Sequence, residues 1–120
     1  MKTNVRIAIL LILVFSSVSL NAFASGGEVE IPRSTAGDKG KYYLLESKKT
    51  GNIVAAVHKR VGPDFTGYTK TETDCSTMKM RELGYSEESP AAIKSNPTKW
   101  FELVPGSSKS DLANFLCKKS

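Results

Sequence analysis

The chain has 120 residues, of which 40% are hydrophobic and 24% charged, and its formal net charge is +5. This composition is typical of one globular domain and excludes collagen-like and disordered proteins. One histidine and two cysteines are too few for a multi-histidine or a four-thiolate metal site, and neither a P-loop nor a dinucleotide-binding glycine motif occurs. We therefore expect no metal and no cofactor.

The first 24 residues have the features of a cleaved signal peptide. Two basic residues precede an uninterrupted apolar run of nine residues at 7–15, and the segment ends in Ala-Phe-Ala at 22–24. Signal peptidase accepts small side chains at the first and third positions of such a triplet. The apolar run is shorter than the roughly 20 residues that a membrane-spanning helix needs. We expect cleavage between Ala24 and Ser25, and therefore export.

The mature chain is expected to be soluble and not to bind nucleic acid. Cleavage removes two of the 17 basic residues and none of the 12 acidic ones, so the formal charge falls from +5 to +3. The remaining basic residues are scattered and do not alternate with aromatic residues as they do on a nucleic-acid-binding face. No second long apolar run follows, so we expect no membrane span.

The first half of the mature chain predicts two strands. Residues 25–39 are rich in glycine and charge without a hydrophobic period, so we expect a flexible lead-in before a domain at 40–118. A short apolar run at 42–45 predicts the first strand. A turn at 47–52 then leads into an apolar, β-branched strand at 53–57, which suits a central position in a sheet.

Two more strands and a short helical turn follow. Threonine alternates with charged residues over 68–75, which favours an edge or exposed strand. Methionine alternates with basic residues over 78–81, which predicts a half-buried strand that runs toward Tyr85. The proline after Ser89 indicates a short helix or a 3₁₀ turn.

The end of the chain predicts a strand and a helix. The apolar and aromatic run at 99–104 is the strongest remaining strand. Ser108 and Asp111 form a capping pattern for a helix with one apolar stripe. That stripe consists of Leu112, Phe115 and Leu116. We expect it to cover a core formed by Ile53, Val57, Trp100 and Leu103. The fold class is therefore α+β: an antiparallel sheet of about five strands with a C-terminal helix packed on one face.

The two cysteines, Cys75 and Cys117, both lie in the exported part. An even number of cysteines in an oxidising compartment normally forms disulfides, and with two cysteines the pairing is forced. The pair lacks the C-x-x-C spacing that lowers a thiol pKa, so we expect a structural bridge rather than a redox site. The bridge would pin the last helix to the strand that ends at Cys75.

The chain resembles the surface-adhesin E type of small exported bacterial domain over residues 40–118. The matching residues are Asp74, Cys75, Trp100, Pro105, Gly106, Ser107, Leu112 and Cys117. The resemblance implies a bent antiparallel sheet whose C-terminal helix is held by a disulfide. It also implies a Gram-negative origin and, for the named member, binding of host extracellular proteins. That adhesin is lipid-anchored, whereas no cysteine lies near Ser25. We therefore expect a soluble periplasmic or secreted protein.

Enzymatic function has little support in the sequence. His58 is the single imidazole, and no G-x-S-x-G motif accompanies a possible Ser–His–Asp triad. Beside Lys59 and Arg60 it is typical of a solvated strand end. The adjacent acidic residues Glu87 and Glu88 rarely converge as a catalytic pair within a loop. An enzyme is therefore the least favoured of three hypotheses.

We expect a non-enzymatic binding module of the bacterial envelope, whose partner is a host extracellular or an envelope protein. Its aromatic residues suit core packing or a binding face. They are Tyr42, Tyr43, Tyr68, Tyr85, Trp100 and Phe101. The alternative is a periplasmic accessory or inhibitor protein that acts through a sheet edge. The sequence also leaves open whether the protein forms a homodimer.

Overall fold

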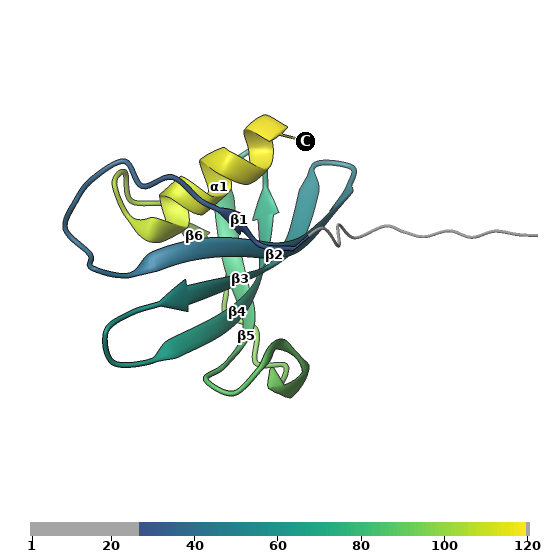
Figure 1. The fold of residues 1–120 in the computed structure, drawn as a ribbon. Coiled ribbons are helices and arrows are strands. Elements are labelled where there is room, and N and C mark those ends of the chain that lie inside the picture. Colours follow the sequence, from purple (N-terminus) through teal and green to yellow (C-terminus); the bar gives the residue numbers. More distant parts are fainter. Residues whose placement is uncertain (1–26, 120) are drawn as a thin grey trace, which may run out of the picture.

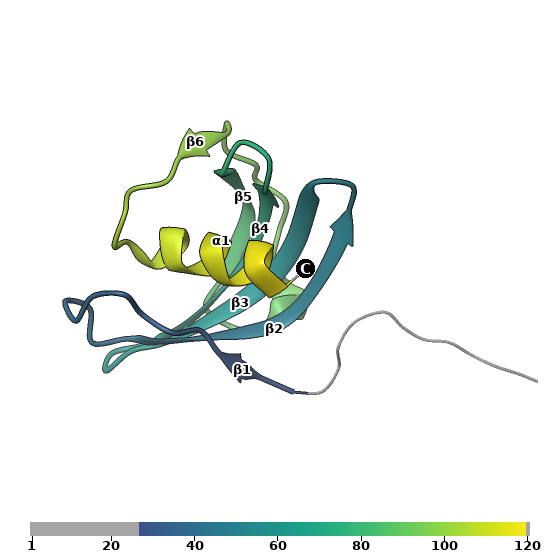
Figure 2. The ribbon, with the colours of Figure 1, turned by 90° about the horizontal axis from the view of Figure 1, so that it is seen from above.

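The computed structural model describes residues 27–119, and the expected signal peptide with its cleavage site between Ala24 and Ser25 lies outside them. The described chain forms one antiparallel sheet of six strands in the order β1-β2-β3-β4-β5-β6, so each strand pairs with its neighbour in sequence. The sheet curves around a single C-terminal helix (Figure 1, Figure 2). The α+β class with a helix on one face is thus confirmed, with six strands instead of about five.

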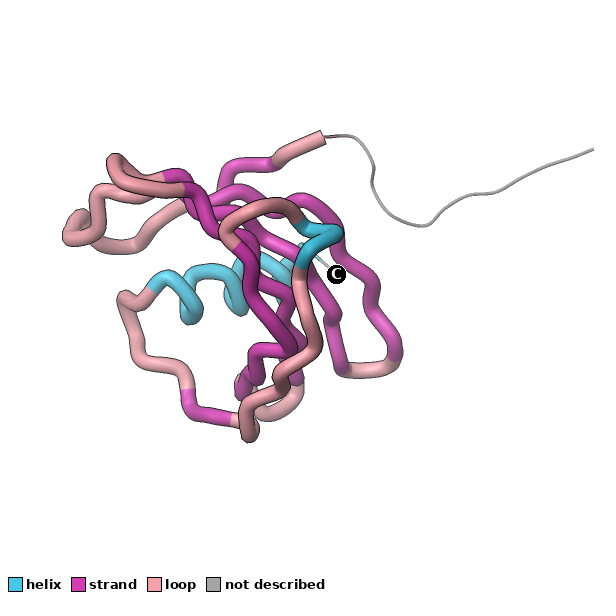
Figure 3. Tube along the Cα trace, turned by 90° about the horizontal axis from the view of Figure 1, so that it is seen from below, coloured by secondary structure: helices cyan, strands magenta, loops and turns pink. Residues whose placement is uncertain are grey.

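The elements alternate with short turns along the chain. They are β1 (Val29–Glu30), β2 (Lys41–Thr50), β3 (Ile53–Val61), β4 (Thr66–Asp74), β5 (Lys79–Ser86), the 3₁₀ helix η1 (Pro90–Ala92), β6 (Phe101–Glu102) and α1 (Ser108–Lys119). The segment that carries η1 runs back along β5 (Figure 3), where the Asn96 N–H donates to Leu83 O and the Thr98 N–H to Glu82 O.

The central hairpin is longer than the sequence pattern predicted. β2 and β3 pair as far as Thr50 and Ile53, so the expected turn at 47–52 shrinks to Gly51 and Asn52. Gly51 has a φ of 61°, a left-handed conformation that glycine adopts without a steric penalty. β5 begins at Lys79, and Met78, with a φ of 57°, belongs to the preceding turn.

Part of the expected lead-in belongs to the sheet. Val29 and Glu30 pair with Leu44 and Tyr43 of β2. Ile31 is only 2% exposed and lies in the hydrophobic core. The lead-in expected at 25–39 is therefore corrected for these residues: they form β1 and contribute to the core.

The core lies between the sheet and α1, on the side that we call the helix face. Its members are Ile31, Tyr42, Leu44, Val54, Ala56, Met80, Leu112, Ala113 and Leu116. Thr71 and Thr73 of β4 also point to this face and are fully buried. The prediction of an edge or exposed strand at 68–75 was wrong, because β4 lies between β3 and β5 and its threonines lie under the helix.

The expected core was right for the helix but partly wrong for the sheet. Leu112 and Leu116 are each 1% exposed, and Phe115 packs against the core in a half-buried position. Leu103 does the same, and Ile53 is half-buried. Val57 is buried, but it alternates with the core residues Ala56 and Val54 and therefore points to the opposite, outer face.

Trp100 is the main error of the expected core, because 39% of it is exposed. The strand expected at 99–104 is reduced to β6, whose Phe101 and Glu102 pair with Met80 and Lys79. Phe101 packs against the core. Trp100 instead lies beside Arg81 of β5, with the guanidinium carbon 5.0 Å from the ring centroid.

The helix is held at both ends. Ser107 rather than Ser108 is the capping residue, since its Oγ accepts a hydrogen bond from the Ser110 N–H at 3.1 Å. At the other end Cys117 forms a disulfide with Cys75, which follows β4, at a Cα–Cα distance of 5.6 Å. The expected bridge between the helix and this strand is thereby confirmed.

Candidate functional site

A pocket of about 300 Å³ lies on the helix face, where the N-terminus of α1 leaves part of the sheet uncovered. We call it the His58 pocket. The residues that matter below come from β3, the β3–β4 turn, β5 and α1. They are His58, Arg60, Phe65, Glu82, Tyr85 and Lys109.

His58 lies in the interior, not at a solvated strand end. It is 8% exposed because β3 continues for three residues beyond it and pairs on both sides, with Leu44 of β2 and Thr69 of β4. Its buried Nδ1 has no hydrogen-bond partner within residues 27–119. Burial, with a smaller contribution from the nearby Lys109 cation, lowers the pKa of His58 to about 4. The imidazole is therefore neutral at physiological pH.

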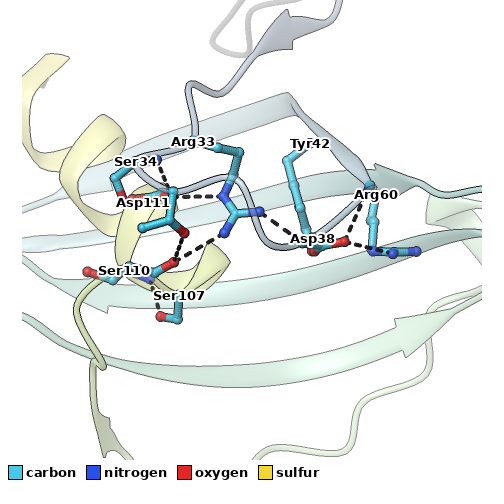
Figure 4. A network of polar contacts seen from close by, with 11 residues as sticks. Arg33, Ser34, Asp38, Tyr42, Arg60, Ser107, Ser110 and Asp111 are labelled. Atoms are coloured by element: carbon cyan, nitrogen blue, oxygen red, sulfur yellow. Dashed lines mark hydrogen bonds and ion pairs between the residues drawn. The ribbon is translucent and has the colours of Figure 1, made fainter.

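The charges around the pocket are paired. Lys109 of α1 bridges to Glu82 of β5 at 2.9 Å, and Arg60 of β3 bridges to Asp38 at 3.0 Å. Asp38 also accepts hydrogen bonds from the Tyr42 hydroxyl and the Gly40 N–H (Figure 4). These hydrogen bonds, that of Tyr42 first, hold the pKa of Asp38 far below its ordinary value, so the carboxylate stays ionised.

Two aromatic rings at the pocket remain in contact with solvent. Phe65 is 44% exposed and Tyr85 is 47% exposed. The Arg60 guanidinium lies 5.4 Å from the centre of the Phe65 ring. Tyr85 lies against the bare backbone of Gly67, where an added Cβ would stand 2.8 Å from a ring carbon. The Tyr85 ring can therefore occupy its position only because residue 67 has no side chain.

Known catalytic arrangements are not assembled in the described chain. His58 makes no hydrogen bond to a serine or a carboxylate within residues 27–119, and its low pKa makes it a weak base. Glu87 accepts a hydrogen bond from the Tyr85 hydroxyl at 3.2 Å, and Glu88 is exposed. The same residues contain no group of three or more His, Cys, Asp or Glu side chains that could hold a metal ion.

The outer face of the sheet carries a second candidate surface, which we call the Trp100 face. Trp100 borders a shallow hollow of about 490 Å³ with Ile53, Ala55 and Arg81. Arg81 is fixed by Glu72, which accepts from its Nη2 at 2.7 Å and from its Nε at 2.9 Å. An aromatic ring and an oriented guanidinium thus lie beside an apolar strip, a combination common at protein-binding surfaces.

Four of the residues that carry the resemblance to surface-adhesin E proteins have different roles in the structure. Trp100 lies on the outer face, whereas Pro105, Gly106 and Ser107 form the turn into α1. Gly106 has a φ of 86°, and its carbonyl accepts hydrogen bonds from the Arg33 and Thr35 side chains, each at 3.2 Å. The last three residues therefore shape the helix start, whereas Trp100 lies exposed on the outer face of the sheet.

A polar network that the sequence did not indicate ties the N-terminal segment to α1 (Figure 4). The Arg33 Nε donates to Asp111 at 2.8 Å, and the Ser34 N–H donates to the same carboxylate oxygen at 2.9 Å. Burial alone would raise the pKa of Asp111, but these two hydrogen bonds outweigh burial and lower it. Asp111 was expected to cap the helix. It instead binds the N-terminal segment that contains Arg33 and Ser34 to the helix.

Comparison of the chain with protein-family models, with curated proteins and with solved structures gave no match. Within residues 27–119, the helices are too short or too polar to cross a bilayer.

The buried neutral His58 predicts that the protein loses stability as the pH falls. The unfolded imidazole titrates near 6.5 and the folded one near 4, so between these values the unfolded state binds more protons. We expect the free energy of unfolding to fall by about 2 kcal/mol from pH 7.5 to pH 5. Urea titrations at the two pH values measure this change.

The control is His58→Gln, which removes the titrating ring. Hydrogen bonds raise the pKa of Arg60 and lower the pKa values of Asp38 and Asp111, so these three groups stay ionised across this range. The free energy of unfolding of the variant should therefore change little between the two pH values. An equal fall in both proteins would contradict a neutral buried imidazole.

Proposed function

We propose that the protein is a non-enzymatic exported module of the bacterial envelope that binds another protein through its Trp100 face. The observation that supports this function most is the 39% exposed Trp100 beside the fixed guanidinium of Arg81. Tryptophan and arginine are enriched among the residues that dominate binding energy at interfaces. The resemblance to surface-adhesin E proteins favours a host extracellular protein, and export favours an envelope protein as the other candidate.

Export itself rests on the signal-peptide pattern and agrees with the disulfide, which persists in oxidising compartments. The absence of a cysteine near Ser25 favours a soluble periplasmic or secreted protein over a lipid-anchored one. The mass of the chain recovered from the periplasm or the medium tests cleavage before Ser25. That exported chain is the material for the binding experiment.

The Trp100→Ala variant is expected to weaken partner binding about 30-fold or more, because a dominant interface residue contributes about 2 kcal/mol or more. The exported protein is immobilised and exposed separately to host extracellular matrix proteins and to envelope extract. The dissociation constant of each captured protein is then measured for wild type and variant.

Phe65→Ala is the matched control, because Phe65 is an equally exposed aromatic residue, 44% against 39%, that lines the pocket on the helix face. It should leave the affinity unchanged. Equal losses for the two variants would point to a general change in the fold. Unchanged affinity after Trp100→Ala would contradict the Trp100 face as the binding site.

An open sheet edge supports the alternative of an accessory or inhibitor protein. β1 pairs with β2 at Leu44 and Tyr43, and no described strand pairs with the outer side of residues 46–50. Such an edge can accept a strand from a partner, although Lys48 and Lys49 on it disfavour indiscriminate pairing. Capture of an envelope protein that survives Trp100→Ala would favour this edge.

A further inference from the structure

We propose that the His58 pocket binds a sugar ring. This second binding activity is independent of the Trp100 face, because the two surfaces lie on opposite faces of the sheet. A sugar ring presents apolar C–H faces and a rim of hydroxyls that both donate and accept hydrogen bonds. A site for it therefore needs exposed aromatic rings beside polar groups of both kinds.

The pocket offers the aromatic part of such a site. Phe65 and Tyr85 leave 44% and 47% of their surface exposed, although each lies against the protein on one side. The ring of Tyr85 is positioned by the missing side chain at Gly67, and the Tyr85 hydroxyl donates to Glu87. Two exposed rings at the same pocket are suited to pack against the C–H face of a sugar.

The pocket also offers hydrogen-bonding groups of both kinds. Arg60 and Lys109 donate, Glu82 accepts, and the Thr69 hydroxyl can do either. His58 is neutral, and its buried Nδ1 has no hydrogen-bond partner within residues 27–119. Donors and acceptors that border the same pocket match the hydroxyl rim of a sugar.

The balance of charge favours a neutral ligand over an anion. Lys109 is paired with Glu82 at 2.9 Å and Arg60 with Asp38 at 3.0 Å, so neither cation is free. An anion would have to displace a carboxylate, whereas a hydroxyl can share these charged groups through charge-assisted hydrogen bonds. The volume of about 300 Å³ lies at the lower end for small-molecule sites, which suits one ring rather than a long chain.

The test follows chemical shifts of the ¹⁵N-labelled exported protein during titration with glucose, galactose, N-acetylglucosamine and its oligomers, and inorganic phosphate. We expect a sugar to shift the amide signals of Thr69, Tyr85 and Lys109 and phosphate to leave them unchanged. Co-sedimentation with purified peptidoglycan and binding to immobilised host glycans distinguish a cell-wall source from a host source of the same ring.

Tyr85→Ala is expected to weaken sugar binding about tenfold by removal of the stacking ring, whereas Tyr85→Phe should retain most of it. Gly67→Ala should also weaken binding, because the new Cβ displaces the Tyr85 ring, which can move at little cost to the fold. It therefore gives a second measurement if Tyr85→Ala does not fold.

Trp100→Ala is the matched control on the outer face and should bind the sugar with unchanged affinity. Failure of the sugar site would thus leave protein binding through the Trp100 face intact. Failure of protein binding at the Trp100 face would likewise leave sugar binding intact. No shift with any of these sugars at millimolar concentration would overturn the proposal. Shifts away from the pocket, or binding of phosphate in competition with the sugar, would overturn it as well.

Discussion

Reduction of the Cys75–Cys117 disulfide is expected to lower the melting temperature by more than 15 °C. The bridge joins residues 42 positions apart, and closing a loop of that length removes about 4 kcal/mol of chain entropy from the unfolded state. A domain of this size loses roughly 4–8 °C per kcal/mol. Calorimetry of the exported protein with and without reductant measures the effect.

The position of the bridge predicts where the reduced protein opens first. Cys117 lies in the last turn of α1, whereas the N-terminal half of the helix is held separately by Leu112, by the Ser107 cap and by the Arg33–Asp111 ion pair. We expect hydrogen exchange to increase first at the C-terminal end of α1. Binding at the Trp100 face should survive reduction below the new melting temperature, because that face belongs to the sheet.

Replacement of both cysteines by alanine is the control for side effects of the reductant and should reproduce the lower melting temperature. Thiol titration of the exported protein before reduction tests the premise. Two free thiols per chain, or a fall of only a few degrees in both experiments, would contradict a stabilising bridge.

The elements that the sequence predicted correctly carry local signals. The stripe Leu112, Phe115 and Leu116 has the period of a helix, and the apolar run at 53–57 has the length and composition of a buried strand. The disulfide followed from the number of cysteines and the expected compartment. Each of these features depends on a few neighbouring residues or on a count, so it can be found without knowledge of the tertiary structure.

The errors arose where distant parts of the chain decide the outcome. β1 pairs through only two residues, so it has no hydrophobic period that would identify it. Alternation separates the two faces of β4 but does not say which one the helix covers, so Thr71 and Thr73 were expected at an edge or exposed position. Trp100 lies in an apolar run, but its neighbour Phe101 packs against the core, and Trp100 lies with Arg81 on the outer face.

The candidate sites were even less visible in the sequence. His58 was expected in solvent because it precedes Lys59 and Arg60, but the strand continues and pairs on both sides. The Arg60 guanidinium forms an ion pair with Asp38, which is 22 residues away in sequence. The His58 pocket combines residues from three strands and a helix, and only the folded sheet brings them together.

Leu112→Ala is expected to lower the free energy of unfolding by about 3 kcal/mol, within the range of 2–5 kcal/mol for a buried leucine. Leu112 is 1% exposed and lies in the core beside Ile31, Val54 and Met80. Its truncation would leave a cavity between α1 and the sheet. Because α1 is fixed at both ends, it cannot easily move toward the sheet to fill this cavity. Urea unfolding with an unchanged m-value measures this loss.

Val104→Ala is the matched control, because Val104 is 67% exposed just before the helix and its truncation should change stability by less than about 0.5 kcal/mol. Phe115→Ala should fall between the two, since Phe115 is half-buried. A loss below about 1 kcal/mol for Leu112→Ala would contradict tight docking of α1.

The losses from Leu112→Ala and from reduction of the disulfide should be nearly additive, because the cavity lies in the native state whereas the disulfide restricts the unfolded chain. Reduction of the Leu112→Ala variant should therefore bring the total loss of unfolding free energy to about 7 kcal/mol. That sum is a large part of the 5–15 kcal/mol available to a domain, so the reduced variant should be partly unfolded even without urea.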